Sequence, residues 1–287
     1  SFPTLLCPAS IHPMKFIHLT DPHLVARSRE IFGFEARDRL AQAVESINAR
    51  FADAELCMVT GDITHLGEAA AYGETNEILS RLNMPWHLLM GNHDDRIAMR
   101  QEFPDAPWRD DGFLQYTLET PAGVFIALDT VDDGRGPGYL CEARLRWFRE
   151  QLLKTADAGR DVFVFMHHPP FDSGIHGMDA QRLTNAEDMI AVLQGFTHIR
   201  HLFFGHLHRT CHGAWRGLPF STVKATSFQI GLVLDNETPV QGTVEDPAYA
   251  IVLVDQDSVV VHDHSYFDDE KIFDFASGPP NPEIAES

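Results

Sequence analysis

Residues 15–23 read KFIHLTDPH, an apolar run of strand length that stops at an aspartate and a histidine. The same arrangement, an apolar run that ends in polar residues, returns at 56–62 (LCMVTGD), 86–94 (WHLLMGNHD), 161–168 (DVFVFMHH) and 201–208 (HLFFGHLH). Between these runs apolar residues recur every three or four positions, which indicates amphipathic helices at 37–51, 68–82, 141–155 and 186–193. Strands that alternate with helices are typical of α/β folds, in which parallel strands end at one edge of a sheet.

Other parts of the chain contain β-like runs without helices between them. Short runs suited to strands occur at 115–120 and 124–128. After Thr210 no helical pattern is visible, and further runs of this kind occur at 229–234, 249–254 and 258–264. We expect one domain over residues 14–267, with an N-terminal extension at 1–13 and an acidic, proline-containing tail at 268–287. Residues 235–247 are acidic and polar, so we expect an excursion or an oligomer contact there.

The composition limits the kinds of partner. The chain has 287 residues, of which 44% are hydrophobic and 22% charged, as in ordinary globular proteins. Its 42 acidic and 22 basic residues give a formal net charge of -20. Such a charge disfavours nucleic acid polymers and anionic membranes, because both bind through Lys and Arg. A small substrate is therefore expected, and a local metal site would attract it if it is anionic.

Other features favour a cytoplasmic protein. The four cysteines contain no CxxC pair, which excludes a zinc-finger spacing and a disulfide-dense scaffold and fits a reducing compartment. The apolar run at 162–166 is far shorter than the roughly 20 residues of a membrane span. Residues 1–13 carry no Lys or Arg and do not have the pattern of a signal peptide.

Seven side chains at the ends of the predicted strands are suited to binding metal ions. Imidazole and carboxylate together favour Zn, Fe, Mn or Co and disfavour calcium. Seven ligands are too many for one ion of this kind, so they indicate two ions that share a bridging carboxylate. The residues are Asp21, His23, Asp62, Asn92, His167, His206 and His208.

In this order, Asp-x-His, Gly-Asp, Gly-Asn-His-Asp, Val-x-x-His and Gly-His-x-His resemble the motifs of the calcineurin-like metallophosphoesterases. His-His-Pro-Pro at 167–170 is similar to the class III cyclic nucleotide phosphodiesterases and their bacterial glycerophosphodiesterase relatives. The resemblance implies a four-layer α/β/β/α sandwich of two mixed β-sheets with helices outside. It also implies that the β-rich segment after Thr210 completes the second sheet and that the protein forms a dimer or a larger oligomer.

The resemblance also assigns roles at the matching positions. Asp21, His23 and His208 would hold one metal ion, and Asn92, His167 and His206 the other. Asp62 would bridge the two ions together with a hydroxide that attacks the phosphorus. Asn92 and His93 would also contact the substrate, His93 as a donor to the phosphate or to the leaving oxygen. Asp94 would fix the orientation of the His93 ring.

Other histidines near the motifs have simpler interpretations. His65 and His212 are close enough in sequence to support the metal ligands, but packing or surface roles are favoured for both. His168 adjoins a predicted ligand and would point the other way along an extended segment. A structural hydrogen bond is therefore favoured for His168 over metal ligation.

Substrate selection must come from loops, since the predicted metal centre is generic. The segment 171–182 is a predicted pocket wall, in which His176 and Asp179 would meet a hydroxyl group, and Phe32 would pack against a base or a leaving group. Some glycerophosphodiesterase-like relatives have Tyr at a position comparable to Phe32 and His near Phe228. The sequence thus predicts a phosphodiesterase for 3′,5′-cyclic nucleotides, glycerophosphodiesters or both. The alternatives are a monoesterase or nuclease with the same centre, or a metal-free binding scaffold.

Overall fold

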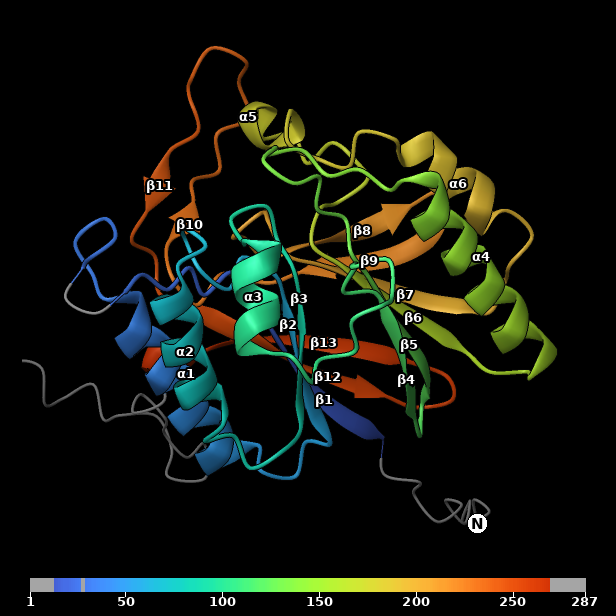
Figure 1. Ribbon diagram of the computed structural model, residues 1–287, viewed down its shortest axis with the longest axis horizontal. Helices are drawn as coiled ribbons and strands as arrows, with labels where there is room; N and C mark the ends of the chain where they lie inside the picture. Colours follow the sequence, from blue (N-terminus) through green and yellow to red (C-terminus); the bar gives the residue numbers. More distant parts are fainter. Residues whose placement is uncertain (1–12, 27–28, 269–287) are drawn as a thin grey trace, which may run out of the picture.

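The computed structural model describes residues 13–26 and 29–268. Two mixed sheets face each other, and helices cover their outer sides (Figure 1). The four-layer α/β/β/α arrangement predicted from the sequence is therefore confirmed. Except for residues 13 and 268, the predicted extension and tail lie outside the described residues. Within the described ranges, no helix combines the length and the apolar character needed to cross a bilayer.

The first sheet has the strand order β13-β12-β1-β2-β3. Its strands are β1 (Met14–Leu19), β2 (Leu56–Thr60), β3 (Trp86–Leu89), β12 (Ala248–Val254) and β13 (Val259–Ser265). β1, β2 and β3 are parallel, whereas β12 runs antiparallel to β1. The expectation that the whole segment after Thr210 completes the second sheet is thus wrong for β12 and β13. Nearly every residue of β12 is buried. A strand that is apolar on both faces needs a position inside the sheet. β12 has such a position, because it lies between β1 and β13.

The second sheet has the strand order β4-β5-β6-β7-β9-β8. Its strands are β4 (Tyr116–Thr120), β5 (Gly123–Leu128), β6 (Val162–Met166), β7 (Ile199–Phe204), β8 (Cys211–Trp215) and β9 (Leu218–Thr222). The predicted hairpin is β4 and β5, and β5, β6, β7 and β9 are parallel. β8 and β9 are the part of the segment after Thr210 that does join this sheet.

Helices lie on both outer faces. α1 (Ala36–Arg50), α2 (Ala69–Leu79) and α3 (Arg96–Glu102) lie on the side of the first sheet, and α4 (Glu142–Asp157) and α6 (Ala186–Leu193) on that of the second (Figure 1). The sequence did not predict α3, which has only seven residues. Its first turn is fixed by Asp95, whose carboxylate accepts a hydrogen bond from the amide of Ala98.

Two shorter features complete the fold near the ends of the strands. The one-turn helix α5 (His176–Asp179) lies within the predicted pocket wall, and β10 (Gln229–Ile230) pairs with β11 (Gly242–Thr243) to form a hairpin. In Figure 1 the hairpin, drawn in orange, rises beside α5. Residues 235–243 of the predicted excursion lie in this hairpin, and residues 244–247 connect it to β12. A short 3₁₀ helix, η1 (Tyr266–Asp268), ends the described chain.

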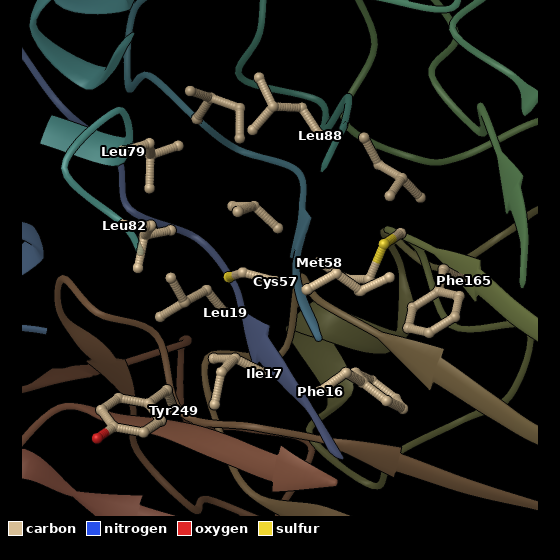
Figure 2. Packing of buried hydrophobic residues seen from close by; sticks show 14 of the residues in the cluster. Phe16, Ile17, Leu19, Cys57, Met58, Leu79, Leu82, Leu88, Phe165 and Tyr249 are labelled. Carbon is tan, nitrogen blue, oxygen red and sulfur yellow. The ribbon is translucent and has the colours of Figure 1, made fainter. Parts of the chain in front are cut away.

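Aromatic side chains fill the space between the two sheets. Phe16 on β1 packs edge-on against Phe165 on β6, with ring centroids 5.8 Å apart, and the two lie side by side in Figure 2. Phe165 in turn stacks on Phe203 of β7 at 4.7 Å. The alternate residues Val164 and Met166 pack in the cluster below the outer helices. β6 is therefore apolar on both faces, which explains why its sequence shows an unbroken apolar run.

Candidate metal centre

The five predicted polar clusters meet at one edge of the sandwich. Asp21 and His23 follow β1, Asp62 follows β2 and Asn92 follows β3, all from the first sheet. The remaining three residues follow β6 and β7 of the second sheet, at the ends where those strands lie beside each other in parallel. Both sheets thus deliver side chains to the same place, as the strand order in the sequence predicted.

The backbone at this edge is strained. Among the described residues, seven non-glycine residues have a positive φ, and five of these belong to the predicted set of metal ligands. The five are Asp21, His23, Asp62, His206 and His208, with φ between 46° and 69°. Such a conformation costs about 1–3 kcal/mol per residue and is concentrated at functional sites. Its presence here indicates that these side chains are aimed at a common point.

The first group of side chains consists of Asp21, His23 and His208. The Nε2 atoms of the two histidines lie 3.0 Å apart, and Asp21 Oδ1 lies 3.3 Å from the Nε2 of His208. Nδ1 of His208 donates a hydrogen bond to the carbonyl oxygen of Phe228 at 2.7 Å, which leaves Nε2 to face the group. A metal-binding histidine is commonly held in this way through its other nitrogen.

The second group consists of Asn92, His167 and His206. Nε2 of His167 lies 3.2 Å from the side-chain oxygen of Asn92 and 3.2 Å from Nδ1 of His206. The other nitrogen of His167 donates a hydrogen bond to the carbonyl oxygen of Thr60 at 2.7 Å. When the ring is neutral, Nε2 therefore points a lone pair at other acceptor atoms. The atoms of Asn92, His167 and His206 that face one another are therefore suited to binding a cation between them.

Asp62 lies between the two groups. Its Oδ2 is 3.4 Å from Nε2 of His23 in the first group and 3.4 Å from Nε2 of His167 in the second. Its Oδ1 accepts a hydrogen bond from the amide of His93 at 2.8 Å. A side chain on Gly91 would displace Asp62, because a Cβ there would lie only 2.2 Å from Asp62 Oδ1. Oδ2 is thus the oxygen placed to be shared.

In each group the electrostatics favour positive charge on one histidine, while burial lowers the pKa of the other, His23 or His206. Burial opposes ionisation of His167, but the adjacent Asp62 carboxylate outweighs burial and raises the pKa of this ring to about 9. Against the same effect of burial, Asp21 raises the pKa of His208. Burial also opposes ionisation of Asp62, yet the neighbouring histidines hold the pKa of its carboxyl well below its usual value. Metal cations satisfy the same demand for positive charge.

Comparison with known proteins identifies the family. The family model of the calcineurin-like phosphoesterases matches residues 14–210, which include all five motifs. The chain belongs to this family. It is 40% identical over 262 residues to a probable cyclic nucleotide phosphodiesterase of Rhodopseudomonas palustris, covering 91% of this chain and 95% of that protein.

Two further comparisons agree with this assignment. The chain is 29% identical over 238 residues to a probable glycerophosphodiester phosphodiesterase GpdQ of Arcobacter nitrofigilis, covering 82% of this chain and 86% of that protein. A dimetal phosphatase of Danio rerio shares the fold, with a TM-score of 0.70, 16% identity and coverage of 89% of this chain and 97% of that one. The relatives named phosphodiesterases are hydrolases of phosphoric diesters, and the Asp/His cluster of this calcineurin-like chain can hold metal ions.

His93 lies beside the cluster, but it is not oriented as predicted. Its Nδ1 donates a hydrogen bond to the carbonyl oxygen of His65 at 2.9 Å. The Asp94 carboxylate instead accepts hydrogen bonds from the amides of Ile63, Thr64 and Gly91 and from the hydroxyl of Tyr72. The prediction that Asp94 fixes the His93 ring is therefore wrong. Asp94 joins the loop after β2 to the loop after β3, because its oxygens are taken by the backbone of both.

His65 takes the supporting role that the sequence left open. Its Nδ1 lies 3.1 Å from Nδ1 of His23, and its ring stacks on that of His93 with centroids 4.9 Å apart. It therefore contacts both a predicted ligand and the predicted substrate donor. The sequence favoured a packing or surface role for His65. His65 lies three residues after Asp62 in a loop, and this spacing does not determine where its side chain points. His212 is exposed on β8, in agreement with the surface role favoured for it.

His168 has a structural role, as predicted. One ring nitrogen bonds the hydroxyl of Thr130 at 2.8 Å and the other bonds the carbonyl oxygen of Gly136 at 3.0 Å. Burial lowers the pKa of His168 to about 3, so the ring is neutral. With both nitrogens occupied, His168 ties the loop after β5 to the loop after β6.

The predicted substrate contacts differ in their surroundings. Phe32 is 70% exposed with a φ of 52°, and its ring meets that of Phe228 edge-on at 5.0 Å. Phe228 in turn lies 4.5 Å from the ring of His208, so the aromatic pair adjoins the first group. His176 is exposed on α5. The carboxylate of Asp179 accepts hydrogen bonds from its own loop, from the amides of Ser173 and Gly174 among others, which opposes the predicted role on a substrate hydroxyl.

Proposed function

We propose that this protein is a phosphodiesterase that uses two metal ions to hydrolyse small phosphodiesters. The observation that carries the proposal is the pair of three-residue groups on either side of the shared oxygen of Asp62. Each group offers one carboxylate or amide oxygen and two histidine nitrogens, a set suited to Mn, Fe, Zn or Co. Similarity to proteins named as phosphodiesterases supports the same conclusion.

In this proposal Asp21, His23 and His208 would hold one ion, Asn92, His167 and His206 would hold the other, and Asp62 would serve both. Two ions in such a site neutralise the charge of the phosphoryl oxygens and lower the pKa of a bound water. Two of the histidines are held through their opposite nitrogens, His167 by the carbonyl oxygen of Thr60 and His208 by that of Phe228. His93, with Nδ1 on the carbonyl oxygen of His65, presents Nε2 to the substrate phosphate or to the leaving oxygen.

We propose 3′,5′-cyclic nucleotides as the preferred substrates. Phe32 and Phe228 form an aromatic surface beside the first group, and every nucleobase can stack on such a surface. Glycerophosphodiesters have no base to use it. The deciding experiment is a hydrolysis panel of cyclic AMP, glycerophosphocholine, bis(p-nitrophenyl) phosphate and p-nitrophenyl phosphate. A higher kcat/KM for glycerophosphocholine than for cyclic AMP would overturn the preference.

A substitution of Phe32 tests the stacking directly. Base–aromatic stacking contributes about 1–3 kcal/mol, so Phe32→Ala should lower kcat/KM for cyclic AMP by roughly 5- to 150-fold. Phe32→Tyr keeps an aromatic ring and should therefore retain most of the kcat/KM for cyclic AMP. Glycerophosphocholine serves as the internal control, and its turnover should change by less than about twofold. Equal losses on both substrates would show that Phe32 acts on the metal site or on the loop rather than on a base.

The same panel separates the alternatives within enzymes. A diester presents one negative charge, whereas a monoester dianion binds two metal ions tightly enough to act like a product. We therefore expect faster cleavage of bis(p-nitrophenyl) phosphate than of p-nitrophenyl phosphate, and the reverse order would indicate a phosphatase. A nuclease is disfavoured by the net charge of -20. Near-zero metal content after purification without chelator, and no activity on adding Mn²⁺, would favour a metal-free scaffold.

We propose that the β10–β11 hairpin mediates contact between two copies of this chain. The hairpin packs on α5, since a Cβ built on Gly177 would lie 2.1 Å from a methyl carbon of Val240. Leu232 and Leu234 in the hairpin and Val244 directly after β11 are nevertheless more than half exposed. Light scattering should show a dimer or a larger species that Leu234→Asp weakens. A 32 kDa species at micromolar concentration would overturn this part of the proposal.

A cytoplasmic location completes the proposal. Cys57, Cys141 and Cys211 are free thiols in the described chain, as a reducing compartment allows. Fractionation of the native host beside a periplasmic and a cytoplasmic marker tests this, and recovery with the periplasmic marker would contradict it.

A further inference from the structure

His18 is a buried histidine that the metal centre does not use directly. It lies on β1 with no exposed surface and faces the space between the sheets. The rings of Phe165 and Phe203 meet it edge-on, with centroids 6.4 and 5.6 Å away. Burial lowers the pKa of His18 to about 3, so the ring is neutral in this apolar position. A polar ring so placed needs a hydrogen-bond partner, because an unmatched buried polar group is costly.

The partner of His18 begins a chain of hydrogen bonds. Nε2 of His18 lies 2.8 Å from the hydroxyl of Thr60, and this hydroxyl lies 2.8 Å from that of Thr20. The hydroxyl of Thr20 lies 2.6 Å from Oδ2 of Asp21. All four residues are buried. The chain therefore runs from the interior of the sandwich to a predicted metal ligand.

The direction of each hydrogen bond follows from the last acceptor. An ionised carboxylate only accepts, so Thr20 donates its proton to Asp21. Thr20 must then accept from Thr60, and Thr60 must accept from Nε2–H of His18. This places the ring proton on Nε2 and leaves Nδ1 as a bare acceptor. Nδ1 is indeed the ring atom of His18 that has no hydrogen-bond partner in the described part of the chain.

The hydrogen-bond chain determines which oxygen of Asp21 faces the first group. Oδ2 accepts from Thr20, and the amide of His206 donates to both oxygens, at 3.0 Å to Oδ2 and 3.3 Å to Oδ1. Oδ1 is the atom that lies 3.3 Å from Nε2 of His208. Gly205 makes room for this arrangement, because a Cβ there would lie 2.4 Å from the hydroxyl of Thr20. The glycine before His206 is therefore required by the close approach of Thr20 and of the carbonyl oxygen of Thr60, which would lie 2.6 Å from a Cβ.

We propose that His18, Thr60 and Thr20 form a positioning network that holds Asp21 and thereby sets the metal affinity of the first group. The network binds Oδ2 and turns Oδ1 toward the ion. It adds hydrogen bonds without adding charge to a cluster already rich in ionisable groups. The inference rests on the proposed function, which makes Asp21 a metal ligand. Partners that hold a ligand in this way typically contribute 10- to 100-fold in metal affinity.

The test is a metal titration of the metal-free, full-length protein, with Zn²⁺ alone in competition with a chromophoric chelator. Thr20→Val removes the hydroxyl and keeps the shape of the side chain. We expect it to weaken one of two binding steps by about 10- to 100-fold. Thr20→Ser keeps the hydroxyl and should restore that step to within about threefold. Thr75→Val is the matched control, because Thr75 is equally buried but donates to the carbonyl oxygen of Ala71 within α2.

The far end of the network gives a second, independent comparison. His18→Gln keeps an N–H donor for Thr60, whereas His18→Leu removes it, so only the leucine variant should weaken the same step. This pair remains informative if Thr20→Val does not fold. Unchanged affinity in a folded Thr20→Val protein, or equal affinities in the two His18 variants, would overturn the inference.

A third variant separates this inference from the proposed function. Asp21→Asn should abolish the same binding step that Thr20→Val weakens. If Asp21→Asn removes the step and neither Thr20→Val nor His18→Leu affects it, the positioning network is refuted and the metal assignment stands. If Asp21→Asn leaves both steps intact, the assignment of Asp21 as a ligand fails, and the network fails with it.

Discussion

Replacing His93 by alanine removes a ring and leaves a backbone amide that the metal site needs. The amide of His93 donates to Asp62 Oδ1 at 2.8 Å, and alanine supplies the same donor. The bridging oxygen of Asp62 should therefore stay in position. We expect the His93→Ala protein to keep its full metal content, since neither proposed set of ligands uses the His93 ring, although the ring lies close to those of His23 and His65.

The size of the effect can be worked from what the ring contacts. It makes one hydrogen bond, to the carbonyl oxygen of His65, one stacking contact, with the His65 ring, and one edge-on contact, with the His23 ring at 4.7 Å. Losing these contacts should lower the free energy of unfolding by about 1–3 kcal/mol. The catalytic loss should be far larger, about 10²–10⁴-fold in kcat, because a positioned proton donor contributes that much. This corresponds to about 3–5 kcal/mol in the activation barrier.

The assay combines metal analysis with kinetics on two leaving groups. Cyclic AMP expels an alkoxide that needs a proton, whereas bis(p-nitrophenyl) phosphate expels a phenolate that does not. The loss should therefore be larger for cyclic AMP. His212→Ala is the matched control, since His212 is exposed on β8, and it should change neither metal content nor rate. Loss of metal from His93→Ala would refute the reasoning. A uniform loss across both leaving groups would make His93 a stabiliser of phosphate charge.

Three further predictions follow from particular contacts. Asp62→Ala removes the oxygen shared by both groups, so metal analysis should show both ions lost together; one ion retained at full occupancy would contradict the bridging role. Burial lowers the pKa of His201 from 6.5 to about 4, so its contribution to stability is present above pH 6.5 and is lost as the pH falls toward 4. Urea unfolding should show that His201 lowers the free energy of unfolding by about 2 kcal/mol between pH 7 and pH 5. This decrease should be absent in His201→Gln, and the same pH dependence in that variant as in the parent protein would contradict the prediction. Tyr72→Phe removes a hydroxyl that donates to Asp94 Oδ1 at 3.0 Å and accepts from the amide of Asp95 at 2.8 Å. It should lower the free energy of unfolding by about 1.5–3 kcal/mol with a smaller loss of kcat than His93→Ala, and a kcat loss of equal size without destabilisation would argue against its structural role.

The sequence by itself determined most of the fold and the location of the site. Apolar runs buried on both faces predict parallel strands, as for β6, because only strands covered on both sides need to be apolar throughout. Polar clusters at the ends of those runs then fall at one edge, since parallel strands end together. The family motifs added the expected partition into two groups around Asp62. None of this depends on knowing which loops touch.

The tertiary structure decided the contacts between loops. β12 pairs with β1 rather than with a strand of the second sheet. The sequence could not predict this, because the local pattern of a strand does not show which sheet edge it will join. Asp94 binds the backbone of two loops rather than the adjacent His93, and His65 reaches His23 across 42 residues of sequence. The chain from His18 to Asp21 passes through Thr60 of a neighbouring strand, so no spacing along the sequence could reveal it. Hydrogen bonds depend on distances of about 3 Å and on direction. Those quantities are fixed only when strands and loops that are distant in sequence are packed together.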